Sequence, residues 1–190
     1  MSKVTNTLKI FFPGRRYSVD RSYLYYLDKY IDGDSIYLNY DSFRGNKDTL
    51  PLEDEIKKDF DFAMNLLKNI DFSKYGEIIL IAKSVGTVVA SKVREEFNLT
   101  RARFICLTPL NETIPFLKQT DFIITSRKDK YIDISQIEST SSHFPFMTIY
   151  DDLPHSLEYE NNLYDTIDLL KTNLDLALNY LDTAYKDLLG

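Results

Sequence analysis

Ser84 has the sequence surroundings of a nucleophile. A run of apolar residues leads up to it, and a stretch with helical spacing follows it. Small residues, Ala82 and Gly86, lie two positions away on either side. A nucleophile on a sharp strand-to-helix turn needs small neighbours, because the turn brings adjacent backbone close together. The pattern predicts an exposed Ser84 hydroxyl and a Val85 amide that, at the start of a helix, can stabilise an oxyanion.

A nucleophilic serine needs a base and an acid, and the later chain offers one of each. His155 follows the last apolar run, 146–150, and Asp129 follows the run 122–125. The chain order serine, aspartate, histidine differs from the orders of chymotrypsin-like and subtilisin-like enzymes. A single histidine in a polar loop is usually a surface residue. A serine, an aspartate and a histidine that each follow a predicted strand, in this order, are hard to attribute to chance. They predict a Ser-Asp-His triad.

The turn Pro13-Gly14 ends the first apolar run, 8–12. Such a turn can aim a second backbone N–H into the same site. A plain strand-to-helix turn is the alternative interpretation, and these residues alone do not decide between the two.

Apolar runs alternate with stretches of helical spacing along the chain. The runs are short and bounded by turn residues, which is typical of buried strands. They lie at 8–12, 35–38, 77–82, 103–107, 122–125 and 146–150, and helical spacing occurs at 24–31, 56–70 and 85–97, with short helices at most in 108–120 and 132–137. This alternation predicts a three-layer α/β/α sandwich with a six-stranded, mainly parallel sheet. Any ligand site then lies at the carboxyl ends of the strands.

The C-terminal segment contains the longest predicted helix, because apolar residues recur in a 4-3 pattern from Leu163 to Leu188. An unbroken helix over 161–189 would be about 43 Å long, whereas a typical sheet is about 20 Å deep. We therefore expect either a break near Thr172-Asn173 or a projecting end that meets a second copy. A monomer and a homodimer through this helix both stay open.

Composition excludes several other classes of protein. The length of 190 residues suits a single domain over 1–190. A net charge of −6 disfavours nucleic-acid binding, and one cysteine with two histidines disfavours a disulfide framework and a cysteine- or histidine-rich metal site. The chain has no apolar run long enough for a membrane span and no segment typical of a secretory signal. We expect a cytoplasmic protein.

Four motifs make the chain resemble the α/β-hydrolase superfamily from end to end, in a small form without a lid and without the first two strands. Residues 12–18 resemble its oxyanion loop, 82–87 its nucleophile elbow, 126–129 its acid turn and 154–157 its histidine loop. Ala82 and Ser126 stand where the motifs commonly have glycine.

The resemblance implies roles for five residues. Ser84 would be the nucleophile, His155 the general base and Asp129 the group that orients it, while Arg15 and Val85 would supply the oxyanion amides. The implied function is a serine hydrolase that cleaves a small carboxylic ester or thioester and needs no metal or organic cofactor. Thioesterase, amidase and acyltransferase variants are not separable from an esterase here. A non-catalytic binding module with the same fold, using the long C-terminal helix, is the alternative.

Substrate contacts are predicted from position alone. Only 108–120 is available for a lid, so we expect an open site, with Leu110 in an apolar wall and Tyr17 at a strand end beside it. Basic residues that follow the predicted strands form a candidate rim for anionic substrates: Arg15, Arg16, Arg44, Lys83, Arg127, Lys128 and Lys130. Arg44 and Lys83 are candidate substrate contacts among them. Ordinary solvation, or pairing with nearby acids, explains the same residues.

Overall fold

The computed structural model describes residues 6–40, 50–139 and 144–183. Its centre is a six-stranded sheet with the order β2-β1-β3-β4-β5-β6, in which neighbouring strands pair in parallel. The strands are β1 (Thr7–Phe12), β2 (Asp34–Tyr37), β3 (Glu77–Lys83), β4 (Arg103–Leu107), β5 (Phe122–Ser126) and β6 (Met147–Tyr150). The six predicted strands are therefore confirmed, with ends that differ by about one residue from the apolar runs.

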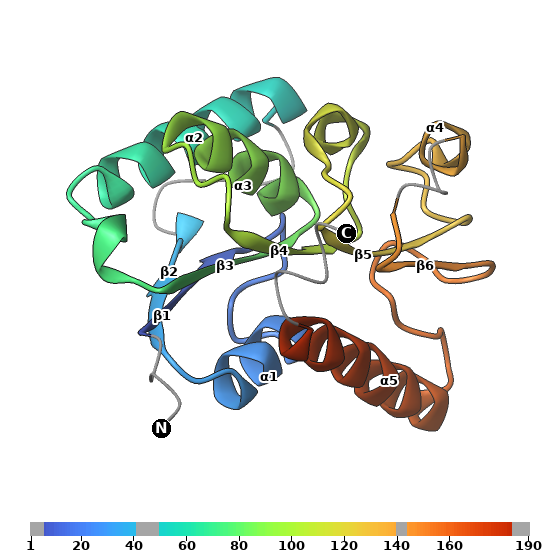
Figure 1. Ribbon diagram of the computed structural model, residues 1–190. Helices are drawn as coiled ribbons and strands as arrows, with labels where there is room; N and C mark the ends of the chain where they lie inside the picture. Colours follow the sequence, from blue (N-terminus) through green and yellow to red (C-terminus); the bar gives the residue numbers. More distant parts are fainter. Residues whose placement is uncertain (1–5, 41–49, 140–143, 184–190) are drawn as a thin grey trace.

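Helices cover both faces of the sheet (Figure 1). One face carries α2 (Leu52–Leu67) and α3 (Val85–Glu96), and the other carries α1 (Ser22–Tyr30) and α5 (Leu163–Asp182). Shorter turns of helix are η2 (Phe72–Lys74), η3 (Asn111–Phe116) and α4 (Ile134–Glu138). The predicted three-layer α/β/α sandwich is confirmed.

Two apolar cores explain why these strands are buried on both sides. Alternate residues of a strand face opposite ways, so Leu8 and Ile10 pack with α2 and α3, while Phe11 packs with α1 and α5. Every residue of β1 is buried. A sheet covered in this way favours continuous apolar strands over alternating ones.

The prediction of a break in the C-terminal helix near Thr172-Asn173 is wrong. The helix α5 runs without interruption from Leu163 to Asp182, and its 20 residues correspond to about 30 Å. Asn173 is buried, and its amide joins the Tyr150 and Tyr23 hydroxyls at 2.6 and 2.9 Å. The Asn173 side chain therefore links α5 to β6 and to α1 by hydrogen bonds. The last predicted turns of this helix lie outside the described residues.

None of the helices in the described ranges is long and apolar enough to cross a membrane.

Candidate active site

Ser84 occupies the one-residue turn between β3 and α3. Its backbone has φ 56° and ψ −129°, a conformation that a residue with a side chain adopts at an energetic cost. The Ser84 N–H donates to the Leu107 carbonyl at 3.0 Å, which ties the turn to the end of β4. This is the strained strand-to-helix turn that the sequence pattern predicts.

Two glycines allow the Pro13-Gly14 turn to lie directly against this elbow. A Cβ on Gly86 would be 2.1 Å from the Phe12 carbonyl oxygen, so no other residue fits there without a shift of backbone. A Cβ on Gly14 would be 3.0 Å from the Ser84 Cβ. The elbow glycine thus permits the close approach of β1 to the start of α3.

Ser84, His155 and Asp129 form one hydrogen-bonded chain. The Ser84 Oγ lies 2.8 Å from His155 Nε2, and His155 Nδ1 lies 2.6 Å from Asp129 Oδ2. A carboxylate can only accept, so Nδ1 carries the proton of the neutral ring. Nε2 is then the acceptor for the Ser84 hydroxyl, which is the arrangement a general base requires.

The acid turn holds both Asp129 and the loop that carries His155. Asp129 is buried, and its Oδ1 accepts from the Tyr131 N–H at 3.0 Å. Ser126 replaces the usual glycine of this motif, and its buried Oγ accepts from the Leu153 N–H at 3.0 Å and the Lys128 N–H at 3.3 Å. The Ser126 hydroxyl therefore joins the acid turn to the histidine loop.

A cavity of about 370 Å³ lies beside the Ser84 hydroxyl; its lining residues are Arg15, Arg16, Leu52, Ser84, Val85, Leu110, Tyr131 and His155. The structure thus brings the predicted oxyanion residues, Arg15 and Val85, and the predicted wall residue Leu110 to the predicted triad. The helix α3 begins at Val85, which lines the cavity, so the positive end of the helix dipole faces the cavity.

Three of the seven residues of the predicted basic rim form ion pairs with nearby acids. The Arg15 guanidinium pairs with the buried carboxylate of Glu55, on the first turn of α2, and also donates to the Leu50 carbonyl at 3.2 Å. Arg127 pairs with Glu138 and Asp151, and Lys128 pairs with Asp152. Pairing with nearby acids, the alternative explanation of these residues, therefore describes all three. Arg16 is exposed and lines the cavity.

Two predicted substrate contacts lie away from the cavity lining. The Lys83 side chain is only 2% exposed, because its amine turns inward to donate to Thr108 Oγ1 and to the His155 carbonyl. Tyr17 packs over that amine and accepts from the Tyr23 N–H, so its ring supports the loop and does not face the cavity. Lys83 is therefore not a rim residue. Arg44 lies outside the described residues.

Two residues that line the cavity, Leu52 and Tyr131, were not predicted from the sequence. Of the two, Tyr131 is in contact with His155. Its ring packs edge-on against the His155 ring with centroids 4.8 Å apart, and its side chain is 48% exposed along the cavity. Only its position, two residues after Asp129, could have indicated a site residue from the sequence. An aromatic residue at that position is not part of a recognised motif.

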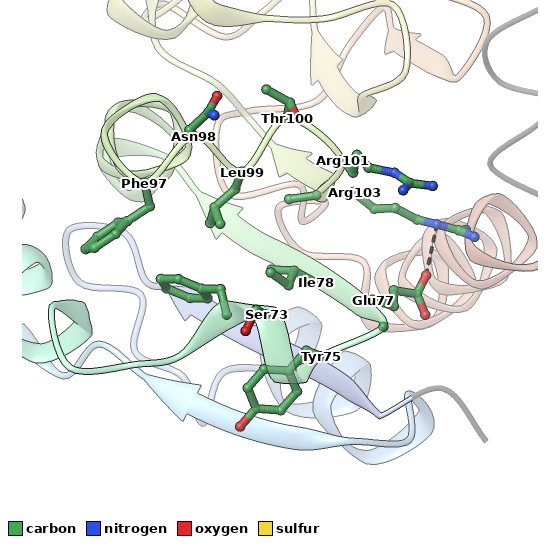
Figure 2. A pocket seen from close by; sticks show the side chains of 13 residues that line it. Ser73, Tyr75, Glu77, Ile78, Phe97, Asn98, Leu99, Thr100, Arg101 and Arg103 are labelled. Carbon is green, nitrogen blue, oxygen red and sulfur yellow. Dashed lines mark ion pairs between the residues drawn. The ribbon is translucent and has the colours of Figure 1, made fainter. Parts of the chain in front are cut away.

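A larger hollow of about 600 Å³ lies at the opposite edge of the sheet, beside the amino ends of β3 and β4 (Figure 2). Phe72, Ile78, Phe97 and Leu99 form its apolar part, and Arg103 pairs with Glu77 at 3.0 Å. Ligands of open α/β sheets bind at the carboxyl ends of the strands. We therefore place the candidate active site at the smaller cavity, where Ser84 lies.

Comparisons with known proteins identify the fold. No family model matches the chain, and no curated protein matches its sequence. Solved structures do match. An α/β serine hydrolase homologue from Coxiella burnetii has a TM-score of 0.61 at 14% identity, over 90% of this chain and 84% of that one. An α/β serine hydrolase without a lid from Xanthomonas campestris has a TM-score of 0.60 at 13% identity, over 95% and 85%.

An esterase from Pyrococcus furiosus has a TM-score of 0.58 at 12% identity, over 94% of this chain and 83% of that one. The chain therefore has the fold of the α/β-hydrolase superfamily. In this chain the connection from β4 to β5 contains only η3, so no lid is inserted there, as the resemblance implied.

Proposed function

We propose that the chain is a serine hydrolase that cleaves small carboxylic esters or thioesters through an acyl-enzyme on Ser84. The hydrogen-bonded chain from Ser84 through His155 to Asp129, with distances of 2.8 and 2.6 Å, carries the proposal. It lies beside a cavity at the carboxyl ends of the strands, on a fold shared with serine hydrolases.

The proposed reaction has two steps. In the first, His155 Nε2 takes the Ser84 proton while Oγ attacks the carbonyl carbon, and the backbone amides of Val85 and Arg15 bind the oxyanion. The imidazolium then gives its proton to the leaving alcohol or thiol. In the second step, His155 deprotonates a water molecule that attacks the acyl carbon, and the proton returns to Ser84 as the carboxylic acid leaves.

The size and lining of the cavity favour a short acyl group. About 370 Å³ is near the lower end of the range of about 300–1,000 Å³ that ligand pockets have. Leu52, Val85 and Leu110 supply apolar surface, and Tyr131 forms a wall next to His155. Because Arg15 is paired with Glu55, we expect a weaker preference for anionic substrates than a free basic rim would produce.

The alternative, a non-catalytic binding module, is not favoured. The solved structures that resemble this chain are described as hydrolases and an esterase. A module without catalysis also has no need for a strained serine in hydrogen-bond contact with a histidine.

Hydrolysis of p-nitrophenyl acetate, butyrate and octanoate tests the proposal. We expect the wild type to turn over the acetyl or butyryl ester fastest and Ser84→Ala to lose this activity. Ser73→Ala is the matched control, because Ser73 lines the hollow at the opposite edge. Activity that survives in Ser84→Ala but falls in Ser73→Ala would contradict the assignment.

A further inference from the structure

The Lys83 amine is a buried cross-link directly beside the nucleophile. Lys83 is the last residue of β3, and its Nζ donates to Thr108 Oγ1 at 2.8 Å and to the His155 carbonyl oxygen at 2.9 Å. The amine also lies 5.1 Å from the centroid of the Tyr17 ring. Burial of an amine is costly unless it is hydrogen-bonded, so these partners account for its position.

The three partners belong to three different loops around the site. Thr108 directly follows β4, with its backbone at φ 45°. Tyr17 belongs to the loop after β1, where its N–H donates to the Gly14 carbonyl at 3.3 Å. His155 belongs to the loop between β6 and α5. One amine therefore links the loops that follow β1, β4 and β6, while Asp129 lies on a fourth loop, after β5.

The histidine loop depends on such side-chain contacts. It runs from Tyr150, the end of β6, to Leu163, the start of α5, without a helix or strand. On the side of Asp129 it is held by the Ser126 hydroxyl, which binds the Leu153 N–H. Lys83 holds the backbone of His155 itself, on the side of the nucleophile.

We propose that Lys83 is a positioning residue that holds the His155 backbone so that the imidazole stays within reach of both Ser84 and Asp129. The inference rests on the proposed function and extends it to a residue that does not touch the substrate. A displacement of about 1 Å can cost a factor of about 100 in rate. Loss of a single contact at the His155 backbone can therefore lower the rate strongly.

The groups around the amine bear on its protonation. Burial lowers the pKa of Lys83 to about 7, and the negative charges of Asp129 and Glu158 oppose that change. Tyr17 is a further titratable group beside it, whereas His155 contacts it through the backbone carbonyl and not through the imidazole. A neutral amine keeps two N–H donors, enough for both hydrogen bonds, so the contact survives deprotonation.

Kinetics of Lys83→Met on p-nitrophenyl acetate test the proposal. The methionine side chain is unbranched and one atom shorter, and it removes the amine that makes both hydrogen bonds. We expect kcat to fall by about 10- to 100-fold with KM unchanged within about twofold, because the loss concerns the position of the base and not substrate binding. Lys83→Gln keeps an N–H donor on a shorter side chain, and its kcat should lie between those of the wild type and Lys83→Met.

Lys9→Met is the matched control. Lys9 is equally buried, but its amine binds Asp28 and the Ile31 carbonyl, far from the site. An unchanged kcat in Lys83→Met, or an equal loss in Lys9→Met, would overturn the proposal. A wild type without Ser84-dependent turnover would instead contradict the proposed function.

A measurement on the wild type covers the case in which neither Lys83 variant folds. With lysine labelled with ¹³C at Cε, we expect one lysine resonance to titrate near pH 7, well below the others. Titration of every lysine together, near the ordinary value of about 10.4, would show that the amine is not held as described.

Discussion

At the scale of single residues, the proposed mechanism requires one tautomer of His155, with the proton on Nδ1. The buried Asp129 carboxylate accepts from Nδ1, and this leaves Nε2 free of a proton and directed at Ser84. The Tyr131 ring packs against the exposed side of the imidazole. The charge of Asp129 and the ring of Tyr131 therefore control how the base is presented, and each can be removed separately.

Replacement of Asp129 by Asn should lower kcat by about four orders of magnitude, because the amide favours the wrong imidazole tautomer. Ester hydrolysis measures the effect. Asp133→Asn is the control, since Asp133 is exposed and caps α4 through the Ser135 N–H. If Asp129→Asn stayed active and Asp133→Asn did not, the acid role would belong to Asp133.

Removal of the Tyr131 ring should lower kcat/KM by a factor of about 2 to 10, the equivalent of an aromatic contact of about 0.5–1.5 kcal/mol. Tyr131→Ala loses the ring that contacts His155, whereas Tyr131→Phe keeps it. We expect Phe to behave like the wild type in ester kinetics. A similar loss in both variants would assign the effect to the hydroxyl.

At the scale of elements, parallel strands bring residues that are distant in sequence to one edge of the sheet. The Ser84 and His155 side chains meet across 71 positions of sequence because β3 and β6 end at that edge. Apolar runs and the small residues around Ser84 predicted this arrangement, since both are local properties. An unbroken α5 was only one of the two alternatives that the sequence left open, because Asn173 has its partners, Tyr150 and Tyr23, on other elements.

Asn173→Leu should lower the free energy of unfolding by about 1–3 kcal/mol, because the Tyr150 and Tyr23 hydroxyls lose a buried partner. Denaturant titration measures this change. Asn179→Leu, an exposed position on the same helix, is the control and should change stability little. Equal stability of the two variants would mean that the buried amide does not hold α5 in place.

At the scale of the whole molecule, the buried basic side chains in the described ranges, Lys9, Lys83 and Arg94, differ in their partners. Arg94 and Asp121 form a fully buried ion pair, and Lys9 pairs with Asp28. Lys83 instead donates to neutral acceptors, and burial lowers its pKa. Because its amine points inward, it does not belong to the basic rim on which its sequence position placed it. Sequence position alone could not reveal this, because Thr108 and His155 are 25 and 72 residues away.

The pKa of Lys83 makes stability depend on pH. The pKa is about 7 in the folded chain and about 10.4 in the unfolded one, so the unfolded chain binds more protons between these values. Stability should therefore rise with pH from about 7 to 10, by up to about 1.4 kcal/mol per pH unit relative to Lys83→Met, and the difference should be flat below pH 7. Denaturant titrations of both proteins at a series of pH values measure it, and a constant difference would contradict the buried amine.

The outer face of α5 bears on the oligomeric state. Leu163, Tyr164 and Ile167 are 68%, 79% and 50% exposed. The homodimer through the C-terminal helix stays a prediction, and light scattering of the wild type and Ile167→Glu distinguishes it from the monomer.

The central claim is that Ser84 is an activated nucleophile, and reaction with a fluorophosphonate tests it most directly. Intact mass after labelling should show a single adduct on the wild type, none on Ser84→Ala and a slower reaction of Asp129→Asn. A folded wild type that forms no adduct, or an adduct that persists in Ser84→Ala, would contradict the account.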